Sequence, residues 1–305
     1  MVGQNPPEHA SAPTPGPERR MTTVSDTERA AALTASAEEL TRLDPDRFAC
    51  LMLADPERRA DLVALLGFAF ETAKTAEVVS ETMIGAIRLQ WWREALDGIE
   101  AGTPRRHQVI DLLAPAIAAH DLPRDRLERM IDAREADFEP TPFADAAAVE
   151  AYARDTAGQL ARLQARVLGV TDDARLDAAE AIGTGFGLAG VLRALPHQAR
   201  RRRVLLPRDR MAAAGLGTGQ VIEPHLRDQA VTAVIATMVA DLAGRAGGLI
   251  ADARKAGRLP RPVAGQAALA RVHLARLARA GHDPFTAPAV LSPARRAFTL
   301  LLARG

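Results

Sequence analysis

The densest cluster of charged side chains in the sequence is a run of four arginines, Arg200, Arg201, Arg202 and Arg203, close behind His197. Guanidinium groups fit phosphate and carboxylate oxygens well, so such a run can bind an anionic group. The same run is equally typical of a solvated loop, and the two interpretations stay open. The apolar segment 204–206 follows directly and predicts that the run is anchored to a core.

A second pattern, Gly185-Phe-Gly-Leu-Ala-Gly190, matches the G-x-G-x-x-G spacing of dinucleotide-binding loops. That chemistry needs a strand before the glycines, whereas residues 172–182 are rich in Ala and Glu and predict a helix. We therefore favour a structural role for the pattern. Gly183, Gly187 and Gly190 lie at steps of four and three residues on one helix face, where a second helix or an extended ligand can approach closely.

The remaining reactive residue types do not form catalytic motifs. The seven histidines are scattered without an H-E-x-x-H pattern, so the sequence predicts no zinc or di-iron site. None of the serines lies in G-x-S-x-G, which argues against an α/β-hydrolase. The single cysteine, Cys50, cannot form an intramolecular disulfide, and its apolar neighbours predict a buried thiol.

Composition limits the class of protein. Lys plus Arg is 39 and Asp plus Glu is 38, and the resulting net charge of +1 argues against a nucleic-acid binder. Hydrophobic residues make up 48% of the chain and aromatic residues only 4%, so an aliphatic core is expected. Ala and Leu dominate, which predicts an all-α fold. The longest apolar runs, such as 62–70 and 231–240, are too short to span a bilayer, and we expect a soluble or peripheral protein.

The elements that must position these residues follow from hydrophobic periodicity and from Pro and Gly. Residues 1–25 are Pro-rich and predict a disordered tail, and residues 26–305 predict a single helical domain. Short helices are expected after Pro207 and Pro293, with a loop over 200–224. The longer helices are expected at 27–41, 56–76, 80–100, 106–119, 124–138, 145–168, 172–194, 225–256 and 264–280.

The helix expected at 80–100 carries the two tryptophans. Its periodicity predicts a core face of Ile84, Ile87, Trp91 and Ala95. Trp92 then becomes the tryptophan that lines a cleft or a partner surface.

Four stretches together resemble the squalene/phytoene synthase family of head-to-head prenyl transferases. They occur in the order and rough spacing of that family, and the resemblance covers about residues 43–300. They are Leu65–Phe70, Arg88–Arg93, Tyr152–Gly158, and the segment from Gly187 through Arg193 to Arg201–Pro207. The resemblance implies an isoprenoid-synthase-like helical bundle with a central cavity.

Enzymes of that family use two Asp-rich motifs on facing helices, which bind Mg²⁺ and thereby the substrate diphosphate. This sequence departs from the pattern at those positions. They hold Thr75, Ala76 and Val79 in the first motif, and Ala194, His197 and Gln198 in the second. Methyl and isopropyl groups cannot bind Mg²⁺, so we expect no catalytic residue, no metal site and no cofactor.

A non-catalytic branch of the family, the mitochondrial assembly factors of respiratory complex I, has also lost these motifs. Residues 192–196, Leu-Arg-Ala-Leu-Pro, resemble the Leu-Arg-Ala-x-Pro of that branch. The resemblance implies a role with complex I subunits or assembly proteins, in the bacterial cytosol or an organelle matrix. The residues expected to bind a ligand or an anion are Arg88, Trp92, Tyr152, Arg193, Arg200, Arg201, Arg202 and Arg203.

Two alternatives stay open at this point. The first is an active prenyl transferase that uses Mg²⁺ bound by other carboxylates, for example Glu71, Glu77 or Glu81 with Asp155. The second is a carrier of an isoprenoid-like or other apolar lipid. Contact of a basic edge with an anionic membrane surface is also compatible with the sequence.

Overall fold

The computed structural model describes residues 25–78 and 82–303, and every regular element in these two segments is a helix. The expected tail, apart from Ser25, and Val79 lie outside the described residues. The first half contains α1 (Asp26–Leu43), α2 (Pro45–Leu51), α3 (Pro56–Val78), α4 (Thr82–Glu100), α5 (Gln108–His120), α6 (Arg124–Asp132), a 3₁₀ turn (Ala133–Phe138), α7 (Ala146–Ala153), a π turn (Arg154–Gly158) and α8 (Gln159–Val167). The second half contains α9 (Asp173–Arg200), α10 (Arg208–Ala213), α11 (Thr218–Ile222), a 3₁₀ turn (Pro224–Leu226), α12 (Gln229–Ala253), a 3₁₀ turn (Arg254–Ala256), α13 (Arg261–Arg279) and α14 (Pro293–Leu301).

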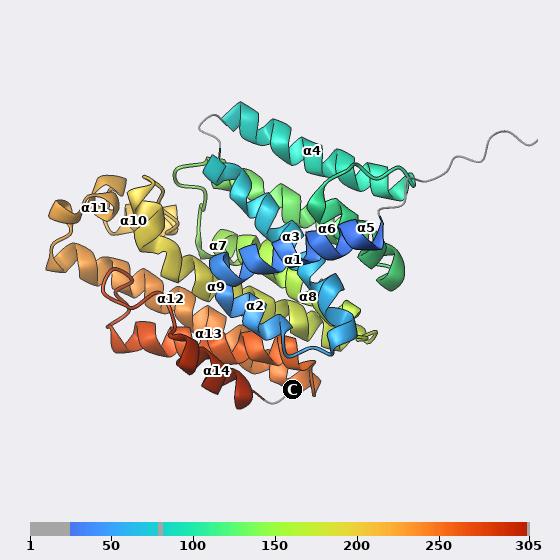
Figure 1. The fold of residues 1–305 in the computed structure, drawn as a ribbon. Coiled ribbons are helices and arrows are strands. Elements are labelled where there is room, and N and C mark those ends of the chain that lie inside the picture. The colour runs from blue at the N-terminus through green and yellow to red at the C-terminus, as the bar shows by residue number, and fades with distance from the viewer. Residues whose placement is uncertain (1–24, 79–81, 304–305) are drawn as a thin grey trace, which may run out of the picture.

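The 28-residue helix α9 is the centre of the bundle. It packs against α12 and α13 on one side and against α8 and the π turn on another. In Figure 1, α4 forms the upper edge of the molecule, while α13 and α14 form the lower edge. The all-α architecture expected from the sequence is confirmed.

The glycines of α9 allow the neighbouring helices to approach closely. A Cβ on Gly183 would lie 2.4 Å from the Ala157 carbonyl oxygen, and one on Gly187 would lie 2.8 Å from the Ala157 Cβ. Gly190 differs, because a Cβ there would meet no atom within 4 Å. Close approach is therefore confirmed for the first two positions, and Gly190 faces open space.

The buried face of α4 is only partly the one predicted, because Ala95 is buried and Trp91 packs against the core but the two isoleucines do not. Gly85, Leu89 and Trp92 are buried, whereas Ile84 and Ile87 are 44% and 63% exposed. Gly85 sets the orientation of the helix, since the Phe138 ring occupies the space where a Cβ would lie. The prediction failed because α4 is apolar on two faces and periodicity alone could not choose between them.

Two further boundaries differ from the predictions. The seven-residue helix α2 was not expected, although Asp44 caps it and Pro45 occupies its first position. It is too short to show a helical repeat in its sequence. The helix expected to end at 194 continues through Pro196 to Arg200, because burial of this segment outweighs the loss of one backbone hydrogen bond.

Two helical segments of the described chain, 173–200 and 229–256, are long and apolar enough to cross a membrane by length and composition. Neither segment is predicted as a membrane span from the sequence, because their uninterrupted apolar runs are shorter than a bilayer requires. Two thirds of the apolar window of α9 is buried inside the bundle, which is also typical of a core helix.

The two kinds of glycine in α9 predict opposite effects of the same substitution. Gly183→Ala forces a methyl group against backbone and should lower the free energy of unfolding by about 1–3 kcal/mol. Gly190→Ala meets open space and should raise it by up to about 1 kcal/mol through helix propensity. Urea denaturation of both variants measures the difference, and equal effects would contradict this account of the packing.

Candidate functional site

A cavity of approximately 490 Å³ lies between α2, α3, the α7–α8 segment and α9. Its walls are mainly apolar, formed by Leu66, Ala69, Phe70, Ala73, Leu160, Val191 and Leu205. Gly187 and Gly190 also lie on the wall, and Gly190 helps to keep it open, since a Cβ there would meet no atom within 4 Å. The cavity therefore offers an apolar space, and two clusters of polar side chains border it.

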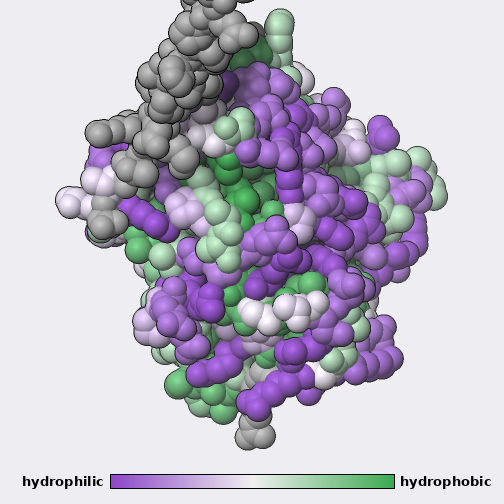
Figure 2. All heavy atoms as spheres, turned by 90° about the vertical axis from the view of Figure 1, so that its right-hand side faces the viewer, coloured by the Kyte–Doolittle hydropathy of each residue, from purple (hydrophilic) through white to green (hydrophobic). Residues whose placement is uncertain are grey.

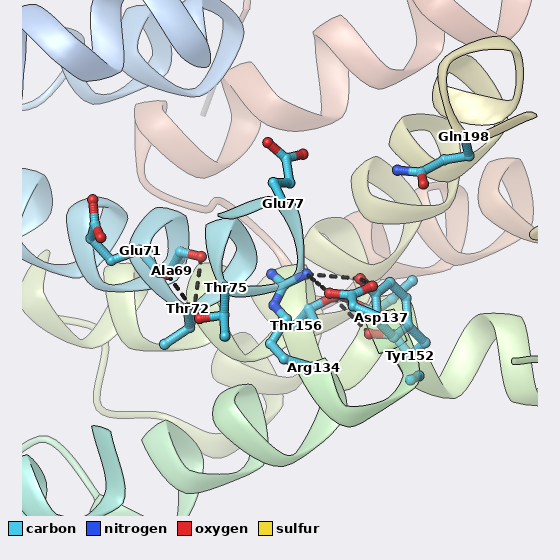
Figure 3. A network of polar contacts seen from close by, with 12 residues as sticks. Ala69, Glu71, Thr72, Thr75, Glu77, Arg134, Asp137, Tyr152, Thr156 and Gln198 are labelled. Atoms are coloured by element: carbon cyan, nitrogen blue, oxygen red, sulfur yellow. Dashed lines mark hydrogen bonds and ion pairs between the residues drawn. The ribbon is translucent and has the colours of Figure 1, made fainter. Parts of the chain in front are cut away.

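The first polar cluster joins Arg134, Asp137 and Tyr152 (Figure 3). The Tyr152 hydroxyl donates to Asp137 Oδ1 at 2.8 Å, and Arg134 Nη1 donates to the Tyr152 hydroxyl at 2.8 Å. Arg203 Nη2 lies 3.4 Å from the same Asp137 oxygen. Burial raises the pKa of the Tyr152 phenol, so the hydroxyl stays protonated as a donor.

The second polar cluster is centred on Asp46, which is 5% exposed. His273 Nε2 lies 2.7 Å from Oδ2, Arg193 Nη1 lies 3.2 Å from the same oxygen, and Arg296 Nε donates to Oδ1 at 2.7 Å. Burial opposes ionisation, but the hydrogen bonds from His273 and Arg296 and the charge of Arg193 hold the pKa of Asp46 well below its usual value. The carboxylate thereby links α2 to α9, α13 and α14.

The surroundings of His273 in this cluster favour the neutral ring. Burial lowers its pKa, and this outweighs the opposing effect of Asp46. A neutral ring can donate its Nε2–H to Asp46. Arg193 Nη1 then donates to Asp46 and to the Ala289 carbonyl.

The expected motif positions lie partly around the cavity. Ala194 and Gln198 line it, as do the expected ligand residues Tyr152 and Arg193. Thr75 is buried and its hydroxyl donates to the Glu71 carbonyl, while Ala76 is half-buried. His197 is exposed at the surface of α9.

The four consecutive arginines do not act as one anion site in the described structure. Their side chains diverge: Arg201 reaches the Ala76 carbonyl, Arg202 pairs with Glu223 at 3.3 Å, and Arg203 pairs with Asp137. Arg200 is exposed at the end of α9. The chain turns immediately after α9, with φ of 58° at Arg202, and this turn separates the guanidinium groups.

Two other expected ligand residues are also corrected. Trp92 is 5% exposed and packs edge-on against Phe68 at 5.5 Å between ring centroids, so it belongs to the core. Arg88 is exposed on α4 and does not line the cavity. The error for Trp92 follows from the choice of the buried face of α4, whereas Arg88 was expected from the family resemblance and remains a surface candidate.

The cavity carboxylates do not fit a Mg²⁺–diphosphate centre. Four of them line the cavity, and each has a guanidinium partner. The pairs are Asp44 with Arg47, Asp46 with Arg193 and Arg296, Glu77 with Arg201, and Asp137 with Arg134 and Arg203. No group of three or more His, Cys, Asp or Glu side chains suited to a metal ion occurs among the described residues. A divalent cation would have to displace these fixed positive charges.

The carboxylates considered for an active enzyme do not converge either. Glu71 lies 3.4 Å from Lys74 and borders a separate small pocket near α5. Asp155 pairs with Arg154 at 3.4 Å. Of the three that the structure describes, Glu77 alone lines the cavity, and Glu81 lies outside the described residues.

No sequence motif predicts the residues that organise both polar clusters, namely Asp46, Arg134, Asp137, His273 and Arg296. One signal was present for Asp46, which follows the Asp-Pro pair typical of a helix start. The others lie within predicted helices, and only the packing of distant elements reveals that they meet.

An all-α bundle with this cavity beside its central helix defines an isoprenoid-synthase-like protein. The squalene synthase HpnC from Alicyclobacillus acidocaldarius has a similar fold, with a TM-score of 0.69 and 21% identity over 87% of this chain and 99% of that chain. The sequence model of the squalene/phytoene synthase family matches residues 40–299, and the chain belongs to this family.

Relatives by sequence include both branches of the family. The chain is 34% identical over 172 residues to the NADH dehydrogenase (ubiquinone) complex I assembly factor 6 of Bos taurus, which covers 56% of this chain and 52% of the relative. It is 25% identical over 184 residues to the chloroplastic phytoene synthase 3 of Zea mays, over 58% of this chain and 43% of the relative. The chain thus spans about half the length of these relatives.

The neutral His273 predicts a pH dependence of stability. Its folded-state pKa lies below the ordinary 6.5, so the unfolded chain binds the proton more readily. The free energy of unfolding should therefore fall as the pH decreases below about 6.5, by at most about 1.4 kcal/mol per pH unit for this one proton. His273→Gln should reduce that slope, measured by denaturant unfolding between about pH 7 and pH 5.

His225→Gln is the matched control, because His225 is exposed on the 3₁₀ turn 224–226 and should leave the slope unchanged. A residual slope is expected in His273→Gln, since burial also lowers the pKa of His107. Equal slopes in the His273 variant and the wild type would contradict a neutral buried ring.

Proposed function

We propose that this chain is a non-catalytic member of its family that acts in the assembly of respiratory complex I. The observation that carries the proposal is the pairing of all four cavity carboxylates with guanidinium groups. Ionisation of a prenyl diphosphate needs carboxylates that are free to hold Mg²⁺. In this cavity each carboxylate instead lies against an arginine of the same chain.

The relatives support the choice of process. The assembly factor 6 of Bos taurus is more similar to this chain than the phytoene synthase 3 of Zea mays is, at 34% against 25% identity over segments of comparable length. The proposed partners are subunits or other assembly proteins of complex I. The proposed location is the bacterial cytosol or an organelle matrix, with the protein soluble or peripheral to the inner membrane.

Removal of the gene tests the proposal in the organism that encodes it. We expect assembled complex I on native gels, and NADH–quinone activity in membranes, to fall several-fold. Succinate oxidation should stay unchanged as the internal control, and the wild-type gene supplied in trans should restore complex I. Purified protein with Mg²⁺ and labelled farnesyl or geranylgeranyl diphosphate should release no product above the protein-free blank.

Fully assembled complex I in the deletion strain would overturn the assembly role. If the wild type converts the prenyl diphosphate and Glu77→Ala does not, the protein is instead an enzyme. Glu77 is chosen because it lines the cavity and its contact with a guanidinium group is the longest of the four carboxylates, at 3.7 Å.

A second candidate function is that of a carrier for an isoprenoid-like lipid. The apolar walls of the 490 Å³ cavity and the polar clusters at its edge favour an occupant with an apolar body and a polar end. In this case the cavity binds and releases its occupant without chemistry.

Gly190→Leu tests the carrier, because the new side chain would extend into the cavity from a position with no atom within 4 Å of its Cβ. Native mass spectrometry of the wild type should show a co-purifying lipid that the variant lacks. Gly244→Leu, on α12 and outside the cavity lining, is the matched control and should retain the lipid. Identical spectra for all three proteins would refute the carrier.

A further inference from the structure

A second hollow, larger than the cavity, lies along α13, a helix that does not line the cavity. It has a volume of approximately 1760 Å³ and runs between α13, α14 and the turn that follows α12. We call it the arginine groove. Its arginines are Arg254, Arg258, Arg261, Arg271, Arg279 and Arg295. Figure 2 shows the side of the molecule that lies on the right in Figure 1, and hydrophobic residues are visible there between predominantly hydrophilic ones.

The groove carries positive charge without compensation. No Asp or Glu lines it, and none of its six guanidinium groups pairs with a carboxylate of the described segments. This contrasts with the cavity, where Arg134, Arg193 and Arg296 all have carboxylate partners. Partial burial and the neighbouring charge of Arg254 lower the pKa of Arg271. Like charges held together in this way attract an acidic occupant.

The floor of the groove is apolar and built from small residues. Ala264, Ala268 and Val272 follow one face of α13 and are half-buried. Phe298 and Leu302 border the groove from α14 and are 64% and 63% exposed. Alanine side chains permit a second helix to approach closely, and the two large exposed side chains offer apolar contact to it.

We propose that the arginine groove binds an acidic amphipathic helix of a partner protein. Its apolar face would lie on the alanine floor and its carboxylates would face the arginines, as in helix-in-groove recognition. Arg261 and Arg279 are 18 residues apart on α13, which corresponds to about 27 Å, so an occupant of about 18 helical residues matches the groove.

The shape and the charge favour this occupant over two others. A bilayer surface is flat on this scale, whereas the groove is concave and long. The N-terminal segment of this chain outside the described residues is not acidic, because Glu8 and Glu18 are balanced by Arg19 and Arg20. The groove does not include the cavity, so the inference stands whether or not the proposed assembly role is correct.

The test uses the full chain and a synthetic helical peptide of about 18 residues with Glu on one face and Leu and Ala on the other. Fluorescence anisotropy should detect binding of this peptide, and an isomer with Lys in place of each Glu should not bind. Arg271→Glu with Arg279→Glu should weaken binding at least about tenfold. Raising the salt from about 50 to about 300 mM should also weaken it.

The matched control is Arg42→Glu with Arg88→Glu, which changes the net charge equally at exposed positions outside the groove. It should bind within about twofold of the wild type. A photo-crosslinker at Ala275, an exposed residue of the groove, should join the peptide to the protein. The conservative variant Arg271→Lys with Arg279→Lys should retain binding.

Three results would overturn the proposal. The first is absence of peptide binding to the wild type. The second is equal loss of binding in the groove and control variants, which would indicate attraction by net charge alone. The third is that the protein binds phosphatidylglycerol-rich vesicles but not the peptide, and that this vesicle binding depends on Arg271 and Arg279. The groove would then be a membrane contact.

Discussion

The pairing of buried carboxylates with arginines governs what this bundle can do. A buried charge is stable only when a partner of opposite sign lies against it. The two least exposed carboxylates at the cavity, Asp46 and Asp137, each have such partners within the chain, which reduces the negative potential that would attract a divalent cation. The same pairs also connect elements far apart in sequence, and the price of removing one partner is an uncompensated charge on the other.

Asp46 shows how structure and function are coupled through such a pair. Its carboxylate receives groups from α9, α13 and α14 while it lies on the short helix α2. The cluster fixes the edge of the cavity and also fixes the position of α14. Because α14 forms one wall of the arginine groove, one buried carboxylate contributes to the shape of both hollows.

The cavity and the arginine groove differ in how their charged side chains are balanced. The cavity contains both signs of charge in matched pairs and exposes mainly apolar walls, which suits an uncharged or amphiphilic occupant. The groove contains one sign only and faces solvent, which suits a charged macromolecular partner. The two hollows thus differ in the kind of occupant that their lining residues favour.

The sequence determined the fold class, most helices and the absence of aspartates at the positions of the Asp-rich motifs. These features follow from local composition and from residues at fixed spacing. Ala194 and Gln198 could be identified as cavity positions through the family pattern alone. The buried face of α4 and the partners of Asp46, Arg134 and Asp137 were decided by tertiary structure. Asp46 and Arg296 are 250 residues apart, and no local pattern records that they meet. Such contacts arise only when the packing of α9 against its neighbours brings distant helices together.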